Sequence, residues 1–114
     1  MARSTEQIYQ HHMNALTNGD LTAFIADYAD DAVLMTMEGA HVGKDAIQTY
    51  FVNALSAMPN TKISPTGHMV QGDFVLLTWT GVSDVATVPH GVDTFVIRDD
   101  KIRLQTVCFM VIPK

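Results

Sequence analysis

The second half of the chain constrains the fold most, because four apolar runs follow one another there with only short polar turns between them. The runs cover residues 62–71, 74–82, 88–98 and 102–112, and two of the turns are Gly72-Asp73 and Asp99-Asp100-Lys101. Short turns join antiparallel strands, whereas parallel neighbours need long crossover connections. The pattern therefore predicts an antiparallel meander.

The first half has the periodicity of helices. Residues 4–18 form an amphipathic segment that opens with Ser4 and Gln7 in a capping-box spacing. Asp20 begins a second helix, whose buried stripe is predicted to include Tyr28, and residues 44–57 form a third. A short strand over residues 32–37 and a loop over 38–43 lie between the second and third helices. With the meander, this predicts one α+β domain over residues 1–114.

Composition excludes several kinds of partner. The net charge is -5 and the basic residues are scattered, so neither nucleic acid nor an anionic membrane surface is expected to bind. The single cysteine, Cys108, cannot form an intrachain disulfide and is predicted to be buried. The histidines lack metal-ligand spacing, and we expect no metal and no cofactor. Without a signal peptide or a run of transmembrane length, a cytoplasmic protein is expected.

Asp93 is the residue that most needs an explanation, because it lies in the apolar run 88–98. If it points to solvent, it belongs to the polar phase of an alternating strand. If it faces the interior, it must be paired or have a raised pKa, since an isolated buried carboxylate is very unfavourable. The strand pattern alone leaves both alternatives open.

Four short motifs occur in the same order as in a known superfamily. They are Asn18-Gly19-Asp20, residues 28–33, residues 41–47 and Asp93-Thr94-Phe95. In this respect the chain resembles the nuclear-transport-factor-2-like superfamily, which includes ketosteroid isomerase and the SnoaL-like polyketide cyclases. The resemblance implies N-terminal helices packed in the concave face of a curved, mostly antiparallel sheet, a cone-shaped α+β barrel with a pocket. It also implies a homodimer through the outer face of the sheet.

The resemblance to ketosteroid isomerase can be followed residue by residue. The oxyanion tyrosine of that enzyme falls on His12, its oxyanion aspartic acid on Asp93 and its catalytic base on Thr36. A threonine cannot abstract a carbon-bound proton at neutral pH, so standard ketosteroid isomerisation is disfavoured. The resemblance implies that His12 and Asp93 approach each other at the bottom of the pocket.

Two interpretations of His12 and Asp93 follow. In the first, they are an acid/base pair of an isomerase-, lyase- or cyclase-like enzyme that acts on a small hydrophobic carbonyl or hydroxyl compound. Asp93 would then be ionised beside a protonated His12, or protonated and donating to a ligand oxygen. In the second, they are a structural pair or are not paired at all, in a non-catalytic ligand-binding or dimerisation module.

The predicted pocket wall combines aliphatic, aromatic and threonine side chains, which suit a small hydrophobic molecule with one or two oxygens. It follows from strand alternation, with Asp93 taken as inward, and from the resemblance. Inward Thr78 and Thr80 place Trp79 on the outer face, although the opposite phase of this strand is equally natural. The predicted residues are Tyr28, Leu34, Thr36, Tyr50, Phe51, Thr78, Thr80, Phe95, Gln105, Val107 and Phe109.

Overall fold

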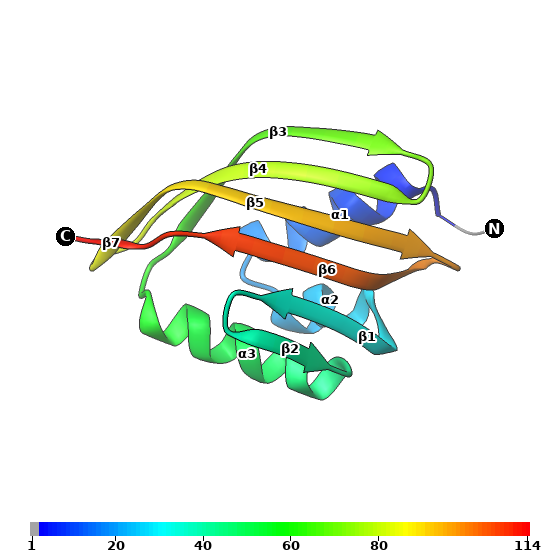
Figure 1. Ribbon diagram of the computed structural model, residues 1–114, viewed down its shortest axis with the longest axis horizontal. Coiled ribbons are helices and arrows are strands. Elements are labelled where there is room, and N and C mark those ends of the chain that lie inside the picture. The colour runs from blue at the N-terminus through cyan, green and yellow to red at the C-terminus, as the bar shows by residue number, and fades with distance from the viewer. Residues whose placement is uncertain (1–2) are drawn as a thin grey trace.

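The computed structural model describes residues 3–114 and has the predicted α+β architecture (Figure 1). Its helices are α1 (Thr5–Thr17), α2 (Leu21–Ala26) and α3 (Lys44–Ala57). Its strands are β1 (Tyr28–Thr36), β2 (Gly39–Val42), β3 (Lys62–Gln71), β4 (Phe74–Val82), β5 (Ala86–Arg98), β6 (Lys101–Phe109) and β7 (Ile112–Pro113).

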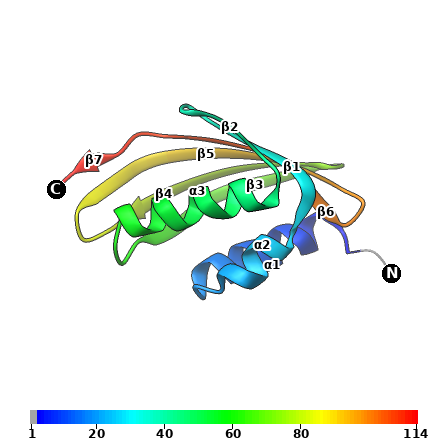
Figure 2. The same ribbon diagram turned by 90° about the horizontal axis from the view of Figure 1, so that it is seen from below.

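The strands form one mixed sheet in the order β2-β1-β6-β5-β4-β3, and β7 pairs with β5. Neighbouring strands are antiparallel except for β1 and β6, which are parallel. The sheet is curved, and all three helices lie on its concave side (Figure 2). The meander predicted from the short turns is therefore confirmed for β3 to β6, and the helices cover one face of it.

The helices begin where the sequence provides local caps. The Ser4 hydroxyl accepts a hydrogen bond from the Gln7 amide at 3.1 Å, and the Gln7 side chain accepts from the Ser4 amide at 2.7 Å. The Asp20 carboxylate accepts from the Ala23 amide at 3.1 Å. Each bond satisfies a backbone donor that the first helical turn leaves free, so both starts could be predicted.

Three boundaries differ from the prediction, and one is that the last run, residues 102–112, is divided between β6 and β7. Helix α2 ends at Ala26, and Tyr28 is the first residue of β1 rather than part of a helical stripe. The Ile102 amide donates to the Asp27 carbonyl at 2.8 Å, so pairing with β6 makes this segment extended. The predicted loop over residues 38–43 contains strand β2, which is paired with β1.

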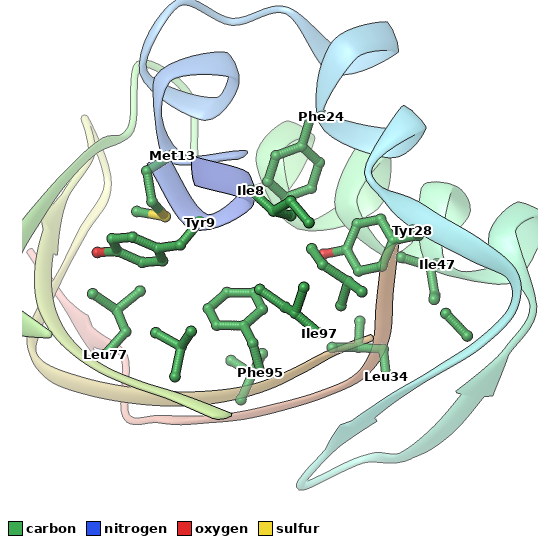
Figure 3. Close-up of a cluster of buried hydrophobic side chains, with 14 of the residues drawn as sticks. Ile8, Tyr9, Met13, Phe24, Tyr28, Leu34, Ile47, Leu77, Phe95 and Ile97 are labelled. Atoms are coloured by element: carbon green, nitrogen blue, oxygen red, sulfur yellow. The ribbon is translucent and has the colours of Figure 1, made fainter. Parts of the chain in front are cut away.

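The core lies between the helices and the concave face of the sheet. Figure 3 shows Ile8 and Phe24 from the helices approaching Phe95 and Leu34 from the sheet. All four side chains are buried.

Of the two phases that the sequence leaves open for β4, the one with Thr78 and Thr80 inward is wrong. Val75, Leu77 and Trp79 are buried on the concave side, so Thr78 and Thr80 lie on the outer face. Cys108 is also exposed on the outer face, contrary to its predicted burial. No helix within residues 3–114 has both the length and the apolar character required to cross a membrane.

Candidate functional site

A cavity of about 100 Å³ lies between the helices and the concave face of the sheet. Most of its wall is apolar, and three of its polar side chains come from α1, β5 and β6, whereas the other two come from α3 and the segment before β3. The apolar residues are Met13, Leu16, Phe24, Phe51, Ala54, Leu55, Met58, Ile63, Leu77, Trp79, Phe95, Val107 and Phe109; the polar ones are His12, Tyr50, Thr61, Asp93 and Gln105. Such a wall suits a small, largely hydrophobic molecule with a polar group at one end.

Asp93 faces this cavity from β5, and its side chain is held at both oxygens. The indole Nε1 of Trp79 donates to Oδ1 at 2.9 Å, and the amide Nε2 of Gln105 donates to Oδ2 at 3.0 Å. Asp93 is only 7% exposed. Burial raises the pKa of Asp93 to about 6, although the hydrogen bonds from Trp79 and Gln105 oppose the rise. The solvent-facing alternative for Asp93 is therefore wrong.

His12 reaches the cavity from α1, and both of its ring nitrogens have partners. Nδ1 lies 3.2 Å from Oδ2 of Asp27, and Nε2 lies 3.2 Å from the hydroxyl oxygen of Tyr28. The ring stacks on Phe24 with 3.9 Å between centroids. Burial lowers the pKa of His12, while the hydrogen bond to Asp27 and the charge of this carboxylate oppose the shift.

His12 and Asp93 are connected, but through two intermediates. The Tyr28 hydroxyl donates to Oε1 of Gln105, and Gln105 donates to Asp93. The direct pairing of His12 with Asp93 that we expected is therefore wrong: the carboxylate partner of His12 is Asp27. The chain His12–Tyr28–Gln105–Asp93, here called the polar chain, runs along the sheet side of the cavity.

Asp27 anchors the far end of the polar chain. It is 1% exposed. Besides the bond with His12, Oδ2 of Asp27 lies 2.8 Å from Nδ1 of His11, and Oδ1 accepts a hydrogen bond from Nη1 of Arg3 at 3.2 Å. Burial alone would raise the pKa of Asp27, but the hydrogen bonds from His12 and His11 outweigh it and lower the pKa. Asp27 is thus the charged group that fixes Nδ1 of His12 as a hydrogen-bond donor.

The predicted lining residues divide into three groups. Six of them line the cavity: Tyr50, Phe51, Phe95, Gln105, Val107 and Phe109. Tyr28 and Leu34 are buried behind the wall, where Tyr28 belongs to the polar chain. Thr36 instead accepts a hydrogen bond from the Glu38 amide at 3.1 Å in the β1–β2 turn, and Thr78 and Thr80 are on the outer face.

Sequence reasoning missed Asp27 and left the facing of Trp79 open. Asp27 falls inside the predicted second helix, where nothing distinguishes it, and no local pattern links it to His12, 15 positions earlier. For Trp79 there was a signal: Gly91 lies opposite it on β5, and a Cβ added there would be 2.2 Å from the indole ring. The glycine leaves the space that the inward tryptophan fills.

Metal ligands do not gather in this part of the molecule. Within residues 3–114, no group of three or more His, Cys, Asp or Glu side chains is arranged to hold a metal ion.

Helices inside a curved sheet, with a cavity between them, define the nuclear-transport-factor-2-like class of α+β proteins, and solved structures of that class share this fold. Within the class, the model of the SnoaL-like domain matches residues 9–105, and the chain belongs to this family. A comparison with curated proteins gave no match.

Similar solved structures come from several sources. A candidate polyketide cyclase from Sinorhizobium meliloti has a TM-score of 0.80 and 24% identity, over 89% of this chain and 93% of that one. A candidate ketosteroid isomerase from Kribbella flavida has a TM-score of 0.80 and 13% identity, over 93% and 77%. TerC co-crystallised with polyporic acid has a TM-score of 0.81 and 17% identity, over 93% and 91%. At these identities the structures establish the fold.

Proposed function

We propose that this chain binds a small hydrophobic molecule carrying a carbonyl or hydroxyl group and acts on it by acid–base catalysis, as an isomerase- or cyclase-like enzyme. Asp93 would transfer the proton. His12 would act behind it through the polar chain, and the apolar cavity would hold the body of the substrate.

The observation that carries this proposal is the position of Asp93. Its carboxyl group is the only one among the residues that line the cavity. With a pKa of about 6, both its protonated and its ionised form are populated near neutral pH. A general acid or base works best when its pKa lies near the working pH.

Relatives support a small organic ligand. Among the similar structures, one is described as a candidate polyketide cyclase, another as a candidate ketosteroid isomerase, and TerC was crystallised with polyporic acid. We infer that cyclic ketones, phenols and quinones are the compounds to test first, because they combine a flat apolar body with one or two oxygens.

Trp79 provides the binding assay. It is the only tryptophan of the chain, it lines the cavity, and its indole nitrogen bonds Asp93. A ligand in the cavity will change Trp79 emission, and each compound that does so is then incubated with the protein and examined for products by chromatography and mass spectrometry. We expect Asp93→Asn to bind such a compound and to convert it about 100-fold more slowly or worse.

Asp30→Asn is the matched control, since the side chain of Asp30 is fully exposed on β1. Equal turnover by Asp93→Asn and the wild type would contradict the role of Asp93. The alternative function, a non-catalytic ligand-binding module, is favoured by the absence of a second carboxyl group in the wall. If compounds bind to the wild-type protein and none of them is converted to a product, the non-catalytic alternative is the better one.

We also propose that two copies associate through the outer face of the sheet. An exposed sheet face is usually polar, whereas the outward residues in the middle of the central strands here are uncharged, and the charged Arg98, Lys101 and Arg103 lie at the β5–β6 turn. The uncharged residues are Leu76, Thr78 and Thr80 on β4, Val92, Thr94 and Val96 on β5, and Leu104, Thr106 and Cys108 on β6.

A further inference from the structure

The polar chain has a restricted set of proton arrangements. Its four members are joined by three hydrogen bonds, and both ends are capped: Asp27 accepts from His12, and Trp79 donates to Asp93. An indole nitrogen can only donate, and an ionised carboxylate can only accept. The directions of the bonds in between therefore depend on where the protons are.

In the arrangement that the structure shows, Gln105 donates to Asp93, so its Oε1 must accept from the Tyr28 hydroxyl. The Tyr28 oxygen has then used its only proton and must accept from Nε2 of His12. With Nδ1 of His12 also donating to Asp27, this arrangement requires His12 to be an imidazolium and Asp93 to be a carboxylate.

A second arrangement satisfies the same bonds. If Asp93 is protonated on Oδ2, it donates to Oε1 of Gln105 after the amide has rotated by half a turn. The amide nitrogen then donates to the Tyr28 oxygen, and the Tyr28 hydroxyl donates to Nε2 of a neutral His12. His12 has lost one proton and Asp93 has gained one, so the proton count and the net charge are unchanged.

Other proton counts break the polar chain. With both ends protonated, the Asp93 O–H faces an N–H of Gln105. With neither end protonated, either Nε2 of His12 or Oε1 of Gln105 has no donor. An unsatisfied polar group is costly in a buried site, and His12, Tyr28 and Gln105 are at most 3% exposed.

We propose that Tyr28 and Gln105 are positioning residues that couple the protonation of His12 to that of Asp93, so that the two ends hold one proton between them. For the role of Asp93, which rests on the proposed function, the coupling means that Asp93 is an acid when His12 is neutral and a base when His12 is charged. The orientation of the Gln105 amide distinguishes the two states.

The surroundings of the two ends bring their proton affinities together. Burial lowers the pKa of His12 and raises that of Asp93, so neither end holds the proton strongly. The titratable and charged groups that face the His12 end are Asp27, His11, Tyr28 and, through Asp27, Arg3. Around Asp93 they are Tyr9, Tyr28 and Tyr50, whose pKa values are raised, by burial first and by the Asp93 charge among the further causes.

The coupling can be measured in the ligand-free protein by the imidazole ¹⁵N shifts of His12, which report its protonation state and tautomer as pH is varied. In Asp93→Asn, the asparagine oxygen can accept from Trp79 while its amide donates to Gln105, which fixes the second arrangement. We expect this variant to hold His12 neutral and to reduce the imidazolium population at least about tenfold, or about one pKa unit.

Asp93→Asn could also change the pKa of His12 simply by removing a nearby negative charge. Measuring its effect on His12 again in a Tyr28→Phe background separates this charge effect from coupling through the polar chain. Tyr28→Phe removes one hydroxyl and keeps both charged ends, so the effect of Asp93→Asn on His12 should disappear there. Gln105→Met interrupts the polar chain at its other intermediate and should give the same result if Tyr28→Phe fails to fold. Tyr50→Phe is the matched control, because it removes a cavity-wall hydroxyl outside the polar chain and should leave the effect intact.

An effect of Asp93→Asn that is equal in all backgrounds would overturn the coupling, as would no effect in any of them. Since no substrate is present, neither result depends on whether the protein is an enzyme. The coupling can therefore hold in a protein that is not an enzyme, and an enzyme that uses Asp93 can lack the coupling.

Discussion

At the scale of the residue, burial of Asp93 makes the stability of the fold depend on pH. Its pKa rises from 3.8 to about 6 on folding because the side chain is buried. Between these values the folded protein keeps a proton that the unfolded chain releases. The folded state binds more protons there, so this residue's contribution to stability falls as pH rises and is lowest above the folded pKa.

Asp93→Asn removes this dependence, since an amide does not ionise. We expect the free energy of unfolding of the variant, relative to the wild type, to rise by about 3 kcal/mol in total as pH increases from well below 3.8 to well above 6. Urea unfolding at a series of pH values measures this difference. Asp30→Asn is the control, and parallel profiles for the wild type and Asp93→Asn would contradict a raised pKa.

At the scale of the element, the phase of β4 depends on a glycine of its neighbour. Trp79 is paired with Gly91 on β5, and its indole ring occupies the volume where a side chain at this position would lie. The inward phase brings Nε1 of Trp79 to Asp93. The same phase puts Thr78 on the outer face.

Gly91→Ala tests this packing. The added methyl group would lie 2.2 Å from the nearest indole atom, so the Trp79 ring must move away from Asp93. We expect a loss of about 1–3 kcal/mol in the free energy of unfolding, typical of an overpacked core, and a change in Trp79 emission. Gly67→Ala is the comparison on β3, since its Cβ would lie 3.4 Å from the Thr78 hydroxyl. Equal stability of Gly91→Ala and the wild type would contradict the close contact.

Elements were predictable to the extent that their signals are local. The starts of α1 and α2 follow from side chains three residues away, and the short turns of the meander follow from their own residues. The end of α2 was not predictable in this way. Tyr28 fits a helical stripe, but the parallel pairing of β1 with β6, 74 positions away, holds it in a strand.

At the scale of the whole molecule, the outer face of the sheet leads to a prediction about assembly. Thr94 is at the centre of this face, paired with Leu76 on one side and Thr106 on the other. If two copies associate through the face, Thr94→Lys places two like charges in a desolvated interface. We expect the wild type to sediment as a dimer and Thr94→Lys as a monomer.

Gln10→Lys is the matched control for sedimentation, because it adds the same charge on the exposed side of α1. It should leave the dimer unchanged. A dimer that persists in Thr94→Lys, or a wild type that is already monomeric, would contradict association through this face.

The sequence by itself determined the α+β class, the capped helix starts, the antiparallel meander and the likeness to the nuclear-transport-factor-2-like superfamily, because these depend on periodicity, caps, turns and short motifs. It also identified His12 and Asp93 as unusual. Only the tertiary structure decided that Asp27 is the partner of His12, that Tyr28 and Gln105 connect His12 to Asp93, and that Trp79 faces inward. These contacts join residues 12 to 77 positions apart, and strand register sets which side chains meet. No local pattern in the sequence records that register.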